Sequence, residues 1–143
     1  RSEPTKRRSG FVSGSGRPAR QTISTMPTLH IHSNIPQDDL SLGQFTGKAT
    51  ELLSKTLGKN TSYIQVVYTR SMIIFGNQAG PSALVELRSV GLTHDQADSL
   101  VAPLSRLVER YLGAPPPTTY LHFHPLDRSL CAWNGRPLEN PAR

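Results

Sequence analysis

One pattern constrains the fold of this chain more than any other: a strand, an amphipathic helix and a second strand occur twice with nearly the same period. Strand-like runs start at Pro27 and, 35 residues later, at Ser62; a second pair starts at Ser82 and, 36 residues later, at Thr118. A strand that returns through a helix lies parallel to its partner. The equal periods predict two similar β-α-β units packed side by side in one domain.

The helix of the first unit is predicted between Asp38 and Gly58. Apolar residues recur there at helical spacing from Leu42 to Leu57. Acidic residues favour the start of a helix, and glycine favours its end.

The helix of the second unit is predicted to begin at Thr93, which forms a capping-box pattern with Gln96. Gly113 and the prolines that follow it are expected to end the helix. Pro103 lies inside this helix and has no backbone N–H, so we expect it to kink or restart the helix.

Four runs rich in β-branched and aromatic residues are predicted as strands, and a shorter one is predicted near the C-terminus: 27–33, 62–69, 82–90, 118–124 and 130–134. Two helices can cover only one face of a four-stranded sheet. The predicted fold class is therefore α/β (an α+β sandwich), with two helices on one face of a four-stranded mixed sheet. The other face needs cover from elsewhere, most simply from another subunit.

The net charge of +6 is unevenly distributed along the chain. Residues 1–26 carry six basic residues and one acidic residue, whereas residues 27–143 carry ten basic and nine acidic residues. The nearly neutral second part argues against a nucleic-acid-binding face on the domain. No apolar run approaches the roughly 18 residues of a membrane span. A lone cysteine, Cys131, excludes a disulfide within the chain.

Residues 1–26 are predicted to form a disordered basic extension, and residues 27–143 a single domain. The extension is rich in Ser, Gly, Arg and Thr and has too few apolar residues to order itself. It is interpreted as sequence upstream of a start at Met26, or equally as an Arg- and Ser-rich targeting peptide. A basic arm retained for binding is the least favoured reading. The extension lacks the apolar core of a secretory signal.

The bond between Met26 and Pro27 decides what chemistry the proline can perform. If synthesis starts at Met26 and the methionine is removed, Pro27 becomes a secondary amine, which can act as a base when it is desolvated near another cation. If residues 1–26 stay attached, the same nitrogen is a non-basic amide. Without a further signal, Pro27 is an ordinary proline at the start of a strand.

Two His-x-His pairs, His30/His32 and His122/His124, each place two imidazoles on one face of a strand. No carboxylate or cysteine stands at ligand spacing beside either pair. Because zinc sites use three or four ligands, we expect no metal site and interpret the histidines as polar lining of a sheet face.

Nine short motifs follow one another along the chain: Met26-Pro27, 34–36 (N-x-P), Gly58-Lys59, Tyr63-Ile64, Phe75-Gly76, 81–84 (P-x-A-L), 89–91 (SVG), Glu109-Arg110 and Trp133-Asn134. Their order and spacing resemble the macrophage migration inhibitory factor and D-dopachrome tautomerase family of the tautomerase superfamily. The resemblance implies a homotrimer with active sites at subunit boundaries. It also implies cofactor-independent keto–enol tautomerisation, with phenylpyruvate and dopachrome as test substrates.

Carried over residue by residue, Pro27 matches the catalytic N-terminal proline. Lys59 matches the pocket lysine, which binds a substrate oxygen and lowers the pKa of the amine. The other matches are substrate-binding positions: the Val90 backbone amide, Ser89, Tyr63 and Trp133 at the rim, and Tyr120 and His122, with Tyr120 expected from a neighbouring subunit. His122 replaces the asparagine of the vertebrate cytokine. The cysteines of the family's C-x-x-C motif are absent from 82–85, so thiol oxidoreductase activity is not expected.

Two functions stay open at this point. The first is a tautomerase for small aromatic keto acids, with Pro27 as the base once Met26 is removed. The second is a cytokine-like binding protein with a vestigial pocket, inactive if the extension is retained. A nucleic-acid-binding role through the extension ranks below both. The expected location is cytoplasmic or secreted without a classical signal peptide, or an organelle if residues 1–26 are a transit peptide.

Overall fold

The computed structural model describes residues 25–138. The predicted extension therefore lies outside the described residues, except for Thr25 and Met26, and so do residues 139–143.

Four strands form one mixed sheet in the order β2-β1-β3-β4: β1 (Thr28–Ser33), β2 (Gln65–Arg70), β3 (Ala83–Val90) and β4 (Thr119–Leu126). β1 is parallel to β2 and β3 is parallel to β4, while β1 and β3 are antiparallel. The predicted pair of β-α-β units is confirmed, and the antiparallel contact between β1 and β3 joins the two units.

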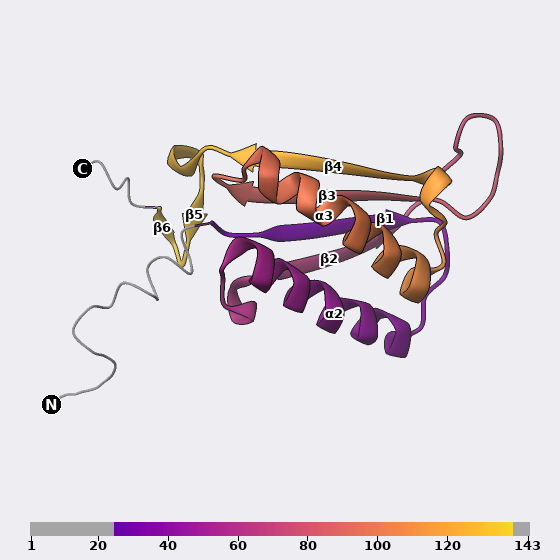
Figure 1. Cartoon of the computed structure of the whole chain (residues 1–143), viewed down its shortest axis with the longest axis horizontal. Helices are drawn as coiled ribbons and strands as arrows, with labels where there is room; N and C mark the ends of the chain where they lie inside the picture. The colour runs from indigo at the N-terminus through magenta and orange to yellow at the C-terminus, as the bar shows by residue number, and fades with distance from the viewer. Residues whose placement is uncertain (1–24, 139–143) are drawn as a thin grey trace, which may run out of the picture.

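Both helices, α2 (Asp39–Leu57) and α3 (His94–Leu107), lie side by side on one face of the sheet (Figure 1). The core lies between this helical layer and the sheet. Its fully buried side chains come from alternate strand positions and from one stripe of each helix: Leu29, Ile31, Val85, Leu87, Phe45, Ala49, Leu53, Leu100 and Leu104. Because side chains alternate with period two on the strands, the second sheet face is left without a helical cover from residues 25–138.

The ends of α2 follow from its sequence. The Asp38 side chain accepts a 2.7 Å hydrogen bond from the Ser41 backbone N–H, which satisfies a donor in the first turn. Gly58 ends the helix in the left-handed region, at φ 67°, where a residue without a Cβ is favoured. The predicted first helix is confirmed at both ends.

The start of α3 is also as predicted: the Thr93 side chain accepts from the Gln96 backbone N–H, and the Gln96 side chain accepts from the Thr93 N–H. The expectation of a restart at Pro103 was wrong, because α3 runs unbroken through it. Leu100 and Leu104 on either side are fully buried, and their packing offsets the missing N–H. A π-helical turn, η2 (Val108–Leu112), then leads to Gly113 at φ 83°.

Several short segments differ from the predicted strands or add to them. Residues Thr61–Tyr63 form a 3-10 turn, η1, so the strand predicted at 62–69 begins only at β2. The short strand predicted at 130–134 is β5 (Ala132–Trp133), and it pairs with β6 (Arg136–Pro137), which was not predicted. Two more 3-10 turns, η3 (Pro116–Thr118) and η4 (Arg128–Leu130), flank β4.

Neither helix in the described part of the chain has the length and apolar character needed to cross a bilayer.

Candidate functional site

A pocket of about 550 Å³ opens beside the start of β1. Its walls come from three places that are distant in sequence: the residues around Pro27, the η1 turn with the first residue of β2, and the β5 strand. The lining residues are Met26, Pro27, Thr28, Ser62, Tyr63, Ile64, Gln65, Ala132 and Trp133.

Pro27 is held firmly at this pocket. It is fully buried, and its carbonyl accepts a 3.0 Å hydrogen bond from the Gln65 backbone N–H at the start of β2. The proline ring therefore lies where the parallel pair β1–β2 begins, at a fixed place in the pocket wall.

Two aromatic side chains, Tyr63 and Trp133, form a second wall. Their ring centroids lie 6.0 Å apart at an angle of 76°, an edge-to-face arrangement that aromatic pairs favour. Trp133 reaches this place because the β5–β6 hairpin turns at Asn134 and Gly135, both with positive φ. Asn-Gly is the preferred sequence for such a two-residue turn, so this signal was readable from the sequence and was missed.

The end of β3 contacts the chain just before Pro27. The Val90 backbone N–H donates to the Thr25 carbonyl at 2.7 Å, and the Ser89 hydroxyl donates to the same oxygen at 2.9 Å. Both Ser89 and Val90 are buried, so these two donors depend on Thr25 for their acceptor. Met26 links this contact to Pro27 with φ at 44°, in the left-handed region.

Lys59 follows the C-terminal end of α2 and immediately precedes the turn that carries Tyr63. Burial first, and the positive charge of Arg128 second, lower the pKa of the Lys59 amine. Its backbone N–H donates to the Ser54 carbonyl at 3.0 Å. Lys59 is close to the pocket along the chain, but it does not line the pocket.

Tyr120 and His122 lie elsewhere. On β4, Tyr120 pairs with Leu84, whereas Leu126 pairs with Val90, so six residues of strand separate Tyr120 from the pocket end of β3. At about 3.3 Å per residue this is about 20 Å. Tyr120 and His122 stack on each other with centroids 6.1 Å apart. Within one chain, they are therefore not brought together with Pro27.

A larger hollow, of about 1020 Å³, lies over α2 and α3 and contains none of the predicted site residues. Charged side chains line much of it, among them Lys48, Glu51, Lys55, Arg106 and Arg110. We take the smaller pocket as the candidate site, because it alone of the two holds Pro27 and aromatic walls.

Comparison with known proteins points to one family. The family model of macrophage migration inhibitory factor (MIF) matches residues 26–138. The macrophage migration inhibitory factor homolog of Brugia malayi is 32% identical over 112 residues, which cover 77% of this chain and 96% of the relative. The homolog of Trichinella spiralis is 29% identical over 112 residues, covering 77% of this chain and 97% of the relative.

The fold gives the same result. The structure of macrophage migration inhibitory factor from Toxoplasma gondii superposes with a TM-score of 0.72 at 26% sequence identity, covering 76% of this chain and 97% of that one. With a family match over most of its length and curated relatives aligned almost end to end, this chain belongs to the macrophage migration inhibitory factor family.

Proposed function

We propose that the chain, once residues 1–26 are removed, is a cofactor-independent keto–enol tautomerase that acts on phenylpyruvate- and dopachrome-like substrates. The observation that carries this proposal is the position of Pro27, fully buried in the wall of a pocket that also holds Tyr63 and Trp133. Membership of the MIF family supports the same class of reaction.

The base would be the Pro27 nitrogen. Removal of Met26 changes this atom from an amide nitrogen to a secondary amine. A free α-amino group has a pKa of roughly 7.7–8.0, and burial disfavours its charged form. The unprotonated amine would therefore take the proton from the carbon beside the substrate carbonyl, and the protonated amine would then give that proton to the enolate oxygen, which yields the enol and restores the free amine.

Two buried donors support an oxygen-binding role at the end of β3. When Thr25 is removed together with the extension, the Val90 N–H and the Ser89 hydroxyl lose the oxygen that now accepts from them. A buried donor without a partner is unfavourable, so these groups would favour a substrate oxygen in the vacated place. Lys59 would add a positive charge for the substrate carboxylate, as the family resemblance implies.

The pocket of one chain lacks Tyr120 and His122, which lie about 20 Å and about 13 Å away along the sheet. In a homotrimer these residues would come from a neighbouring subunit. Exposure of the Tyr120 side chain, 58% in the single chain, is in keeping with that arrangement.

The test compares three chains in a phenylpyruvate tautomerisation assay: one that begins at Pro27, the same chain with Pro27→Gly, and the full chain of residues 1–143. Intact mass first establishes each N-terminus. The chain that begins at Pro27 is expected to be active, and the other two should lose most of the turnover. Unchanged turnover in the Pro27→Gly chain would contradict the role of Pro27 as base.

A second function, a cytokine-like binding protein with a vestigial pocket, is favoured by the contact between Thr25 and Val90. In a chain that keeps residues 1–26, Pro27 has no free amine and the Thr25 carbonyl already accepts from the donors at the end of β3. Absence of turnover in the chain that begins at Pro27, with correct mass and fold, would leave this second function as the better account.

A further inference from the structure

The open face of the sheet carries a histidine cluster built around one carboxylate. His30 and His32 come from β1, His122 and His124 come from β4, and Glu86 of β3 lies between the two pairs. In the strand register, Glu86 pairs with His30 on one side and with His122 on the other. Along the chain, no carboxylate stands at ligand spacing beside either histidine pair, as noted above. Strand pairing supplies the missing group.

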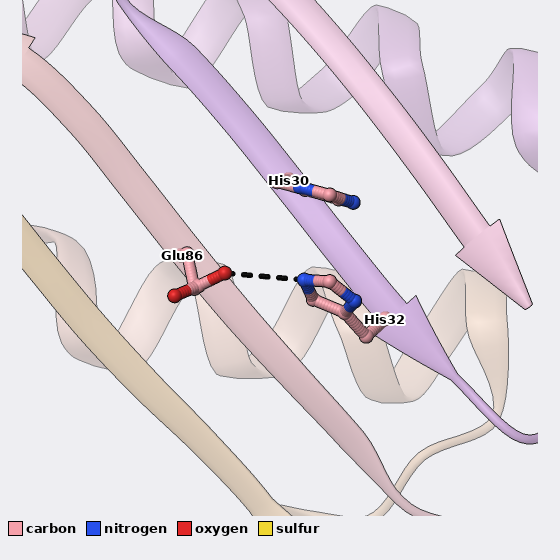
Figure 2. A group of neighbouring side chains, drawn as sticks. All are labelled: His30, His32 and Glu86. Carbon is pink, nitrogen blue, oxygen red and sulfur yellow. Dashed lines mark hydrogen bonds and ion pairs between the residues drawn. The ribbon is translucent and has the colours of Figure 1, made fainter. Parts of the chain in front are cut away.

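We propose that His30, His32 and Glu86 form a Zn²⁺ site, with water as the fourth ligand. One ligand atom from each of the three side chains lies within 4.8 Å of the other two. Figure 2 shows Glu86 reaching from β3 towards His32, with the His30 ring stacked beside His32. Two imidazoles and one carboxylate are an established ligand set for zinc with one open position.

The distance between two of the ligand atoms already fits this ion. Nε2 of His32 lies 3.1 Å from Oε1 of Glu86. With metal–ligand bonds of about 2.0–2.2 Å, tetrahedral geometry separates two ligand atoms by about 3.3 Å. Zn²⁺ would therefore replace the hydrogen bond between His32 and Glu86 with little movement of either side chain.

The other imidazole, His30, contacts a hydroxyl on β2, and because its ring is stacked on His32 with centroids 3.9 Å apart, it would turn to aim a lone pair at the same ion. Nε2 of His30 lies 2.8 Å from the Thr69 hydroxyl on β2. If Nε2 donates this bond, Nδ1 keeps the lone pair that a metal needs. A zinc-binding histidine ordinarily donates its second ring nitrogen to a neighbouring oxygen in this way.

The two carboxylate oxygens of Glu86 distinguish between the two histidine pairs. Oε2 of Glu86 lies 3.2 Å from the Arg88 guanidinium. The same oxygen lies 3.3 Å from Nε2 of His124, but that nitrogen is not aligned for a hydrogen bond. A metal bound by His122 and His124 would compete with Arg88 for this oxygen. Oε1 faces His32, so the pair on β1 has the better placed oxygen. In the single chain, the side chain of Glu86 is 14% exposed and that of His32 is 25% exposed, so the proposed ligands are partly desolvated.

Calorimetric titration of the full chain with Zn²⁺ tests the proposal. The result does not depend on tautomerase activity or on whether Pro27 has a free amine. The unaltered chain is expected to bind one Zn²⁺. His32→Gln and Glu86→Gln should each weaken binding by about 10-fold or more, since changes even to groups behind the ligands have effects of that size.

Two control variants cover the histidine and the cysteine that lie outside the cluster and could also bind zinc. His94→Gln, at the start of α3, and Cys131→Ser, before β5, should leave Zn²⁺ affinity unchanged. Circular dichroism verifies that every variant is folded, and Glu86→Gln keeps the side-chain volume if His32→Gln does not fold. Absence of saturable binding by the unaltered chain would overturn the site. Zn²⁺ affinity that is unchanged in both His32→Gln and Glu86→Gln would also overturn the site. So would Zn²⁺ affinity that is lost only in a His122→Gln/His124→Gln chain.

Discussion

The backbone N–H of Val90 donates a 2.7 Å hydrogen bond to the carbonyl of Thr25, two residues before Pro27. This bond ties the end of β3 to the segment that the proposed activity requires to be absent. Removal of Thr25 with the extension would therefore free the Val90 N–H at the end of β3, beside the pocket.

Hydrogen exchange at Val90 should report this connection. In the full chain its amide is expected to be protected. In the chain that begins at Pro27 the acceptor is gone, so the Val90 amide should exchange faster. The Gln65 amide, which donates to the Pro27 carbonyl, is the matched control and should stay protected in both chains. Equal protection of Val90 in both chains would show that Thr25 is not its acceptor.

Two glycines should respond to alanine in opposite directions. Gly135 lies in the β5–β6 turn at φ 75°, which an L-residue adopts at a cost of about 1–2 kcal/mol, so Gly135→Ala should destabilise the fold. Gly47 lies inside α2 with open space around its missing Cβ, and Gly47→Ala should stabilise the fold by about 0.5–1 kcal/mol. Urea unfolding of both variants measures the two changes. A shift in the same direction for both would contradict the backbone conformations described above.

The capping box of α3 gives a third prediction. Thr93→Ala removes the acceptor for the Gln96 backbone N–H and should lower the free energy of unfolding by about 1 kcal/mol. Thr93→Ser keeps the hydroxyl and should lose much less. Denaturant unfolding of the two variants side by side separates the cap from the rest of the side chain. An equal loss for both would argue against the cap as the cause.

Asp38 gives a pH dependence whose sign follows from its hydrogen bond. The bond from the Ser41 backbone N–H lowers the pKa of Asp38 below its ordinary value of 3.8. Because the folded state favours the charged form, the stabilisation is present above the unfolded pKa and is lost as pH falls through the folded value. The unaltered chain should therefore exceed Asp38→Asn in stability at pH 6, and the two should converge at acidic pH. Urea midpoints across this range measure the difference, and a gap that widens on acidification would reverse the sign.

Local sequence signals accounted for much of the fold. The two helices began and ended near the predicted caps, since Asp38, Gly58, Thr93 and Gly113 act on their own neighbours. The helix did not restart at Pro103, where Leu100 and Leu104 are buried in the core, a tertiary contact that the local rule does not include.

The site was less accessible to sequence reasoning. The pocket depends on the β5–β6 hairpin, which places Trp133 beside Tyr63. The Asn-Gly sequence at 134–135 predicts this hairpin, but the prediction was not made. The position of Glu86 between the histidine pairs depends on the register of three strands, which spacing along the chain does not encode. The separation of Tyr120 from Pro27 also follows from strand register, so spacing along the chain did not predict it.

The central claim is that a free Pro27 amine is the catalytic base. The most direct test purifies the protein from its own source and measures the intact mass and the phenylpyruvate turnover of the same sample. The account predicts a chain that begins at Pro27 and is active. An active sample that retains residues 1–26 would contradict it, because its Pro27 nitrogen is an amide and cannot accept the proton.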